Sequence, residues 1–124
     1  MVGPACPHNW VGFQGRCYYF SREEKNWTSS QSFCHSQQAS LARIESEQKD
    51  FINLFKLKYT YWIGLRRKPG QPWKWLNEEK ATLPVMGDGG DCAYLNDEVK
   101  ASSSRCSTEH HWMCSKADAL HNPK

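Results

Sequence analysis

Cysteine gives this sequence most of its chemistry, because a thiol can form a disulfide, bind a soft metal ion or act as a nucleophile. The chain has six cysteines, at Cys6, Cys17, Cys34, Cys92, Cys106 and Cys114. No two of them are spaced Cys-x-x-Cys, and the adjacent His110 and His111 would point to opposite faces of a strand, so we expect no metal site and no cofactor. Six cysteines in 124 residues instead indicate an extracellular domain stabilised by disulfides.

Catalytic motifs give little support to an enzyme. The sequence contains no glycine-rich phosphate loop, nucleophile elbow or paired-histidine metal motif. Glu109-His110-His111 lies near serines and imitates a hydrolytic set only in composition. Asp88 and Asp91 could bind a cation, but a segment rich in glycine and aspartate is more typical of a solvated loop. We therefore expect a protein that is not an enzyme.

Length and charge exclude several other classes of protein. A chain of 124 residues and 14.4 kDa is long enough for one ordinary core. Its net charge is +3, and the longest basic run is Arg66-Arg67-Lys68, so we expect no nucleic-acid partner. No stretch approaches 18 apolar residues, and no apolar leader follows Met1. We expect Met1 to be an added start and the natural chain to carry its targeting segment upstream.

The elements that must position the cysteines are two helices and several short strands. Thr28-Ser-Ser-Gln31 is a capping-box pattern that predicts a helix from Thr28 to about Gln38. Ser46 could cap a second helix, with an apolar face and with Lys56 and Lys58 in its last turn. The predicted strands are Trp10–Phe13, Cys17–Phe20, Tyr61–Leu65, Trp73–Leu76, Cys92–Leu95 and His111–Cys114.

Six cysteines allow fifteen pairings, and local structure narrows them. The turn at Gln14-Gly15 predicts a hairpin that brings Cys6 beside Cys17. In the same way, the strand that begins at Cys92 and the segment that reaches Cys106 flank a polar loop from Asn96 to Arg105. Those two local pairs leave Cys34 for Cys114.

The order of these motifs resembles the long form of the C-type lectin-like domain. The resemblance covers residues 6–116 and rests on Cys-x10-Cys, a helix ending in cysteine, a second helix, Trp62-Ile-Gly-Leu65, Trp73-Lys-Trp75 and Cys-x13-Cys-x7-Cys. It implies an α+β fold with two helices, two small antiparallel sheets and the pairs Cys6–Cys17, Cys34–Cys114 and Cys92–Cys106. Residues 1–5 would then be an added start or a stalk remnant, and 117–124 a C-terminal tail.

Sugar-binding members of this family hold a calcium ion through carboxylate and amide oxygens, and these ligands are missing here. The Glu-Pro-Asn or Gln-Pro-Asp triplet of such members is replaced by Leu83-Pro84-Val85. Their Trp-Asn-Asp triplet is replaced by Ala101-Ser102-Ser103. Asn96-Asp97 lies too close to Cys92 to take its place. We therefore expect no calcium-dependent sugar binding.

The amino-acid sequences of four segments are similar to those of the Clr and lectin-like-transcript group within this family. They are Trp10-Val-Gly-Phe13, Asn26-Trp-Thr-Ser-Ser-Gln31, Pro69-Gly-Gln-Pro-Trp-Lys-Trp75 and Cys92-Ala-Tyr-Leu-Asn-Asp97. This resemblance implies a type II membrane protein on leukocytes whose ectodomain is a ligand for lectin-like receptors of natural killer cells. Two other functions stay open, a glycan-binding lectin with a divergent or calcium-free site and a non-catalytic dimer scaffold.

Surface positions follow from these hypotheses. Loops on a rigid scaffold are natural recognition surfaces, so we expect a receptor-binding patch before and after Cys106. Its candidate residues are Tyr94, Asp97, Glu98, Lys100, Arg105, Glu109 and His110.

The second helix carries more apolar side chains than a single core-facing stripe of a helix would use. This excess suggests a homodimer through Phe51, Ile52, Leu54 and Phe55. Asn26-Trp27-Thr28 is the only glycosylation sequon, and we expect a glycan on Asn26.

Overall fold

Strand β9 (His111–Ala117) pairs with three other strands in the computed structural model, which describes residues 5–120. It is antiparallel to β2 (Arg16–Phe20) and β3 (Ser40–Leu41) and parallel to β4 (Tyr61–Arg66). The remaining strands are β1 (Val11–Phe13), β5 (Lys74–Trp75), β6 (Val85–Met86), β7 (Cys92–Leu95) and β8 (Ala101–Ser104). The main strand order is β1-β2-β9-β4-β7-β8-β6.

The sheet is therefore mixed, whereas the sequence predicts two small antiparallel sheets. Two antiparallel groups do exist, one around β2 and β9 and one around β4 and β7. The parallel pairing of β4 with β9 joins them, and β6 also runs parallel to β8. Parallel pairs connect segments far apart in the chain, so no local turn signal reveals them.

The first hairpin forms as predicted. Gln14 and Gly15 both have positive φ, at 49° and 82°, which is the geometry of a two-residue hairpin turn with the right twist. Val11 pairs with Tyr18 and Phe13 with Arg16. The hairpin therefore places Cys6 and Cys17 close enough to form their disulfide.

Helix α1 spans Trp27–Ser36, and its cap differs from the predicted one. The N-cap is Asn26, whose Oδ1 accepts a hydrogen bond from the Ser29 N–H at 2.8 Å. Thr28 lies inside the helix, and its side chain is exposed. It is not needed as a cap, because Asn26 already accepts a hydrogen bond from the first turn. The helix also ends before Gln38, which adopts a left-handed conformation with φ of 59°.

The second helical segment has two parts and is shorter than predicted. A 3₁₀ turn, η1 (Ser46–Gln48), precedes helix α2 (Lys49–Phe55). The cap is Glu45 rather than Ser46, because Glu45 and Gln48 form a reciprocal capping box. Lys56 is the C-cap, so the predicted basic last turn lies beyond the helix.

Tryptophan fills much of the core, as the resemblance implies for Trp62. Trp27, Trp62, Trp75 and Trp112 are all at most 3% exposed. Three of their indole N–H groups have partners: Trp27 donates to Ile63 O at 2.9 Å, Trp62 to Lys25 O at 2.9 Å, and Trp75 to Thr82 Oγ1 at 3.0 Å. These bonds fix large rings at set angles while their apolar surface is buried.

Gly64 in β4 is required by a close backbone approach. A Cβ atom at this position would lie 2.5 Å from the carbonyl oxygen of Leu41. The Gly64 N–H also donates to Ala42 O at 2.9 Å. The glycine of the Trp62-Ile-Gly-Leu65 motif therefore allows the segment after α1 to pack directly on β4.

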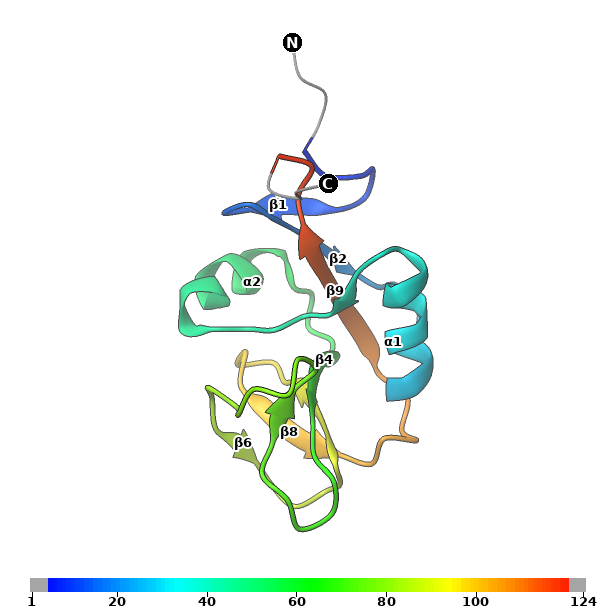
Figure 1. Ribbon diagram of the computed structural model, residues 1–124, viewed down its shortest axis with the longest axis vertical. Helices are drawn as coiled ribbons and strands as arrows, with labels where there is room; N and C mark the ends of the chain where they lie inside the picture. Colours follow the sequence, from blue (N-terminus) through cyan, green and yellow to red (C-terminus); the bar gives the residue numbers. More distant parts are fainter. Residues whose placement is uncertain (1–4, 121–124) are drawn as a thin grey trace.

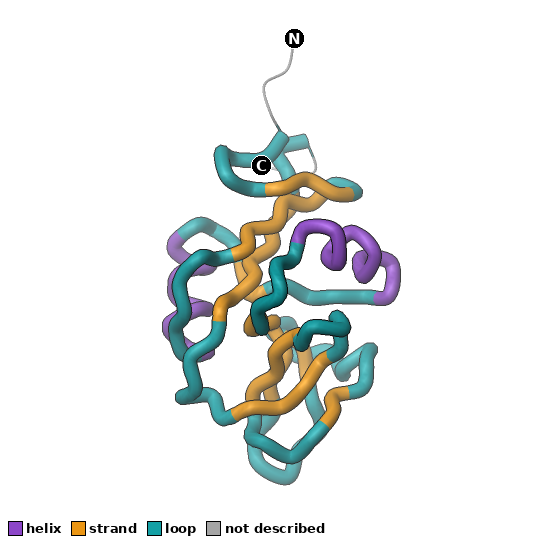
Figure 2. Tube along the Cα trace, turned by 180° about the vertical axis from the view of Figure 1, so that it is seen from behind, coloured by secondary structure: helices purple, strands orange, loops and turns teal. Residues whose placement is uncertain are grey.

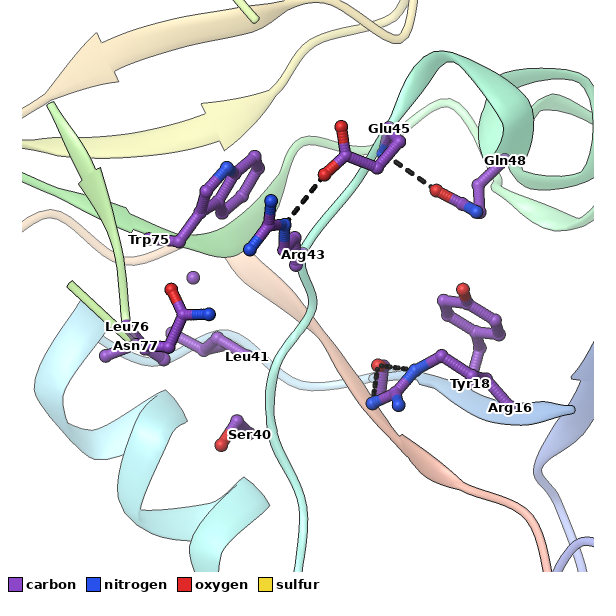
Figure 3. Close-up of a pocket in the computed structure, with 12 residues that line it drawn as sticks. Arg16, Tyr18, Ser40, Leu41, Arg43, Glu45, Gln48, Trp75, Leu76 and Asn77 are labelled. Carbon is purple, nitrogen blue, oxygen red and sulfur yellow. Dashed lines mark hydrogen bonds and ion pairs between the residues drawn. The ribbon is translucent and has the colours of Figure 1, made fainter. Parts of the chain in front are cut away.

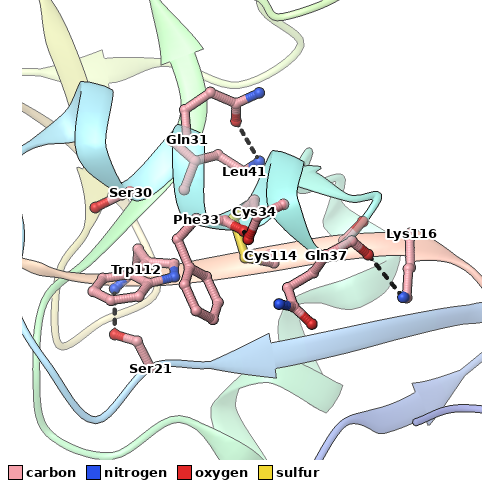
Figure 4. Close-up of a disulfide and its surroundings, with 12 residues drawn as sticks. Ser21, Ser30, Gln31, Phe33, Cys34, Gln37, Leu41, Trp112, Cys114 and Lys116 are labelled. Atoms are coloured by element: carbon pink, nitrogen blue, oxygen red, sulfur yellow. Dashed lines mark hydrogen bonds between the residues drawn. A yellow bond between two sulfur atoms is a disulfide. The ribbon is translucent and has the colours of Figure 1, made fainter.

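The three predicted disulfides are all present, and the described residues contain no free cysteine. Cys34–Cys114 ties α1 to β9 across 80 residues of sequence (Figure 4). In the same region the side chain of Gln31 accepts a hydrogen bond from Leu41 N–H at 2.9 Å. The helix is thus fixed both to the sheet and to the segment that follows it.

The two helices lie on opposite sides of the long β2 and β9 strands (Figures 1 and 2). The β1–β2 hairpin and both ends of the described chain lie at one end of the molecule, and β6 and β8 lie toward the other. Ala119 N–H donates to Ala5 O at 2.9 Å, so the ordered domain extends past the expected boundary at residue 116. Residues 1–4 and 121–124 lie outside the described residues.

We predict that the Cys34–Cys114 disulfide stabilises the fold more than Cys6–Cys17. The separations are 80 and 11 residues, and chain entropy assigns about 4.5 and about 3 kcal/mol to loops of these lengths. Cys34→Ala/Cys114→Ala should therefore lower the free energy of unfolding in urea more than Cys6→Ala/Cys17→Ala. An equal or reversed order would contradict this entropic ranking.

Candidate protein-binding face

A row of paired residues runs across the sheet from the core to the surface. Trp112 pairs with Trp62, Trp62 with Tyr94, Tyr94 with Ser102, and Ser102 with Met86. Residues paired in neighbouring strands point to the same face of a sheet. Trp62 is fully buried, Tyr94 is half-buried and Met86 is 50% exposed. Tyr94 is therefore an aromatic side chain supported from behind by the core.

His110 stacks on Tyr94 and completes this aromatic cluster. The ring centroids of His110 and Tyr94 lie 4.4 Å apart with an interplanar angle of 19°, and the His110 and Trp62 rings meet edge to face at 4.5 Å. Thr60 Oγ1 lies 2.6 Å from His110 Nδ1, and Ser104 Oγ lies 3.3 Å from Nε2. Both ring nitrogens are thus held, so the imidazole cannot rotate freely.

The pKa of His110 is lowered from its ordinary value of 6.5, chiefly because burial disfavours the charged ring. The carboxylate of Glu24 opposes this shift, and the neighbouring His111 adds to it. Burial also lowers the pKa of His111. The aromatic cluster is therefore uncharged at neutral pH.

Charged residues flank the cluster at its two ends. Asp97, Glu98 and Lys100 lie in the turn between β7 and β8, while Arg105 and Glu109 follow β8 at the other end. All five side chains are exposed. The two groups are separated by the length of β8, roughly 15 Å from the strand rise. Lys100 lies 3.9 Å from Glu98, and no ion pair engages Arg105 or Glu109 within residues 5–120.

We call these seven residues the β7–β8 face. The sequence predicts all seven as a patch; the structure stacks Tyr94 on His110 and pairs Lys100 with Glu98, and it separates the two charged groups along β8. The patch is supported by three residues that the sequence did not single out: Thr60, Ser104 and Met86. A lone threonine, serine or methionine carries no sequence signal for such a role, because only the pairing of distant strands places it there.

The segment from Asn96 to Arg105 contains a four-residue strand where the sequence predicts only a polar loop. Ala101–Ser104 forms β8, although three serines in a row have no strong strand preference. The turn that precedes it is short, because Asn96 Oδ1 accepts hydrogen bonds from the backbone N–H groups of Glu98 and Lys100. This side chain therefore closes the β7–β8 hairpin.

The stretch from Gly87 to Asp91 is also more ordered than a solvated loop. A Cβ atom on Gly90 would lie 2.4 Å from the Ser104 backbone, and Gly89 N–H donates to Ser103 Oγ at 2.8 Å. Asp91 Oδ1 accepts from Arg67 Nε at 3.0 Å. Asp91 is thus neutralised by a guanidinium, and residues 5–120 hold no group of three His, Cys, Asp or Glu side chains able to bind a metal ion.

Helix α2 divides the four predicted dimer residues into two pairs. Phe51 and Ile52 are 6% and 0% exposed and belong to the core, so the prediction that they form a dimer surface is wrong. The rings of Phe51 and Phe13 stack with their centroids 4.4 Å apart, so the apolar surface of Phe51 is covered within the domain. Leu54 is 81% exposed and Phe55 47%. The exposed apolar group continues into Leu57 and Tyr59.

Asn26 serves as a helix cap at the sequon, which bears on its glycosylation. The hydrogen bond to Ser29 uses Oδ1, and a glycan would be attached through the side-chain nitrogen. Capping and glycosylation are therefore compatible at the same residue. The glycan on Asn26 stays a prediction.

The disulfides, the buried Trp62-Ile-Gly-Leu65 strand and the two helices beside a mixed sheet define a C-type lectin-like domain. Residues 23–116 match the family described as the lectin C-type domain, and the chain belongs to this family. Human C-type lectin domain family 2 member D is 54% identical over 117 residues, covering 92% of this chain and 60% of the relative. Mouse member G, or Clr-g, is 41% identical over 125 residues, covering 96% and 46%.

These relatives confirm the resemblance to the Clr group. The chain spans about half the length of the relatives that it matches. Among solved structures, the carbohydrate-recognition domain of the mouse scavenger receptor C-type lectin superposes with a TM-score of 0.83 at 26% identity, over 90% of this chain and 98% of that one. In residues 5–120, no helix is both long and apolar enough to cross a lipid bilayer.

We predict that His110 titrates below pH 6.5 and that folding stability falls as the pH drops through this range. The folded state holds the ring neutral while the unfolded state protonates more readily, so acid favours unfolding. An NMR titration of the imidazole proton resonances would measure the pKa of His110. His110→Phe keeps an aromatic ring and should flatten the pH dependence between 6.5 and 5; a His110 pKa at or above 6.5 would contradict the prediction.

Proposed function

We propose that this chain is the extracellular domain of a cell-surface protein recognised by a lectin-like receptor of natural killer cells. The β7–β8 face is the proposed contact surface, and binding does not use calcium. The observation that carries this proposal is the half-buried stack of Tyr94 on His110, supported by buried Trp62 and flanked by exposed charges. Binding hot spots commonly combine a rigid aromatic anchor with a charged rim.

Rigidity supports a protein-binding role for this surface. The Cys92–Cys106 disulfide spans 14 residues and encloses the whole β7–β8 hairpin. The Asn96 side chain closes the turn of that hairpin, and His110 is held at both ring nitrogens. A surface that is ordered before it meets its partner loses less conformational entropy on binding.

The charges on this face favour specificity over non-selective binding. Arg105 and Glu109 have opposite signs and no ion-pair partner within residues 5–120, so each is available to a charge on a receptor. Such exposed charges mainly set the association rate and the choice of partner. The aromatic cluster would supply most of the affinity, because its apolar area is buried on contact.

Independence from calcium is supported by the residues that replace its ligands. Val85 lies in β6 and pairs with Ala101 in β8, so two apolar residues meet between the two altered triplets. Asp91 is paired with Arg67. These contacts leave no cluster of carboxylates in this region of the described chain, whereas calcium takes six to eight oxygen ligands.

Binding to a panel of natural killer lectin-like receptors, measured by surface plasmon resonance, tests the proposed surface. Tyr94→Ala and Arg105→Ala should each weaken the binding of the responding receptor about tenfold, as expected for an anchor and a paired charge. Lys80→Ala, an exposed cation near β5, is the matched control and should bind as the wild type. Arg105→Ala and Lys80→Ala should leave the thermal transition unchanged, whereas Tyr94→Ala should lower it because a half-buried ring is lost, with the domain still folded at the temperature of the binding experiment.

Chelation separates this function from that of a glycan-binding lectin. Receptor binding should be the same with calcium and with EDTA, and a glycan array should show no calcium-dependent signal. If a sugar binds only in the presence of calcium, the proposal of calcium-free protein recognition is wrong. If Tyr94→Ala and Arg105→Ala both bind normally, the receptor contacts a different surface.

We further propose a homodimer through the exposed end of α2. Leu54, Phe55, Leu57 and Tyr59 form a run of exposed apolar side chains, and exposed groups of this kind often mark protein contacts. A symmetric dimer would bury the same residues from both copies.

Sedimentation velocity at rising concentration tests the dimer. The wild type should show a concentration-dependent shift toward twice its mass of 14.4 kDa. Leu54→Asp should remain monomeric, because a charge cannot be buried in an apolar contact without a large cost. Met86→Asp makes the same type of change at a residue that is 50% exposed on β6, and it should dimerise as the wild type does. A wild type that stays monomeric at high micromolar concentration would remove this proposal.

A further inference from the structure

A cavity of about 450 Å³ lies on a different part of the molecule from the β7–β8 face (Figure 3). Its walls come from β2 and β9, from the segment between β3 and η1, and from the turn after β5. None of the seven residues of the β7–β8 face lines it. The volume falls within the range of roughly 300–1,000 Å³ that is typical of sites for small organic molecules.

Tyr18 places an unpaired hydroxyl in this cavity. The residue is 1% exposed, and its ring packs on Phe51 with centroids 5.2 Å apart. In Figure 3 its hydroxyl points toward Gln48, into the space between the labelled residues. No group within residues 5–120 forms a hydrogen bond with this hydroxyl. The hydroxyl reaches the space of the cavity, so it is free to donate a hydrogen bond to a ligand there.

Arg16 and Gln48 leave further hydrogen-bond donors at the same end of the cavity. Arg16 donates to Ser115 Oγ through Nε at 3.1 Å and Nη2 at 2.8 Å, which leaves Nη1 free. Gln48 uses its Oε1 to accept from Glu45 N–H at 2.7 Å, which leaves its amide N–H groups free. Burial raises the pKa of Tyr18, so its hydroxyl keeps its proton and can also donate.

The carboxylate of the cavity is already occupied. Glu45 is the one carboxylate among the lining residues, and it accepts from Arg43 Nε at 2.7 Å and from the backbone N–H of Gln48. Arg43 is also paired with Glu79, so its charge is balanced within the protein. The unbalanced groups are thus donors and one guanidinium, which favour an anionic acceptor.

The opposite end of the cavity is apolar. Figure 3 shows Trp75, Leu41 and Leu76 on the side away from Tyr18 and Arg16, together with the amide of Asn77. Trp75 is held in place by its bond to Thr82, and the guanidinium of Arg43 lies 5.6 Å from its ring centroid. This wall favours a flat apolar group, whereas the Tyr18 end favours an anion.

We propose that this cavity binds a small organic carboxylate with a flat apolar body, its carboxylate at Tyr18 and Arg16 and its body against Leu41 and Trp75. The free hydrogen-bond donors favour the carboxylate group of the ligand, and the apolar wall favours its flat apolar part. Inorganic anions would lack the second contact. The proposed site is independent of receptor binding, because it shares no residue with the β7–β8 face.

Titration of ¹⁵N-labelled protein with sodium 1-naphthoate, followed by two-dimensional NMR, tests this site. Saturable shifts should appear at backbone amides that border the cavity, including Leu41, Gly64 and Gln48. The neutral 1-naphthamide should bind at least about fivefold more weakly, because it cannot form a charged hydrogen bond with Arg16. Inorganic phosphate should give no saturable shifts at these amides.

Two variants assign the binding to the proposed donors. Tyr18→Phe removes only the hydroxyl and keeps the ring, so the fold should be retained while naphthoate binds about fivefold more weakly. Arg16→Gln should weaken binding by at least as much. Arg22→Gln, at an exposed arginine outside the cavity, should bind as the wild type. The proposal is overturned if naphthoate gives no saturable shifts up to about 5 mM, or if Tyr18→Phe and Arg16→Gln both bind it normally.

Discussion

Two short contacts between parallel strands, Tyr61 with His111 and Trp62 with Trp112, connect the parts of this domain. On one side they join the β1–β2 hairpin and α1 through β9. On the other side they join β5, β7, β8 and β6 through β4. The residues involved are nearly all fully buried, so the pairing also closes the core. Cys34–Cys114 then fixes β9 to α1 from the other face, which holds this central pairing in register.

The candidate surface depends directly on that pairing. His110 immediately precedes β9, and Tyr94 pairs with Trp62 on the neighbouring strand. A shift of one residue between β4 and β9 would separate the imidazole from the tyrosine ring and turn alternate side chains to the opposite face. The same constraint therefore sets both the core and the aromatic cluster. The segment from Gly87 to Asp91 beside this surface is held in place, because Asp91 pairs with Arg67 and because Gly89 and Gly90 lie close to the backbone of Ser103 and Ser104.

Local patterns could predict the first hairpin, the Tyr61–Leu65 strand and the three disulfide pairs, because apolar runs, turn residues and cysteine spacing can be seen directly in the sequence. They could not predict β8, whose serines form a strand only because β6 and β7 pair with it on both sides. The inward orientation of Phe51 follows from its stacking on Phe13, which lies 38 positions earlier in the chain. Local sequence does not distinguish a cap at Asn26 from one at Thr28, because both side chains can accept a hydrogen bond from the first turn; the backbone geometry selects Asn26. The positions of the candidate residues can be proposed from the sequence, but the stacking of Tyr94 on His110 depends on the pairing of β4 with β7 and β9.

The hydrogen bond between Ala119 and Ala5 brings the two ends of the described chain together at one end of the molecule, far from β8 (Figure 1). A linker fused at either end would therefore leave from the same side. Display on a multivalent scaffold should present the same surface outward whichever terminus is used. Valency could then be raised without altering a single contact residue, and the gain in avidity would depend on linker length alone.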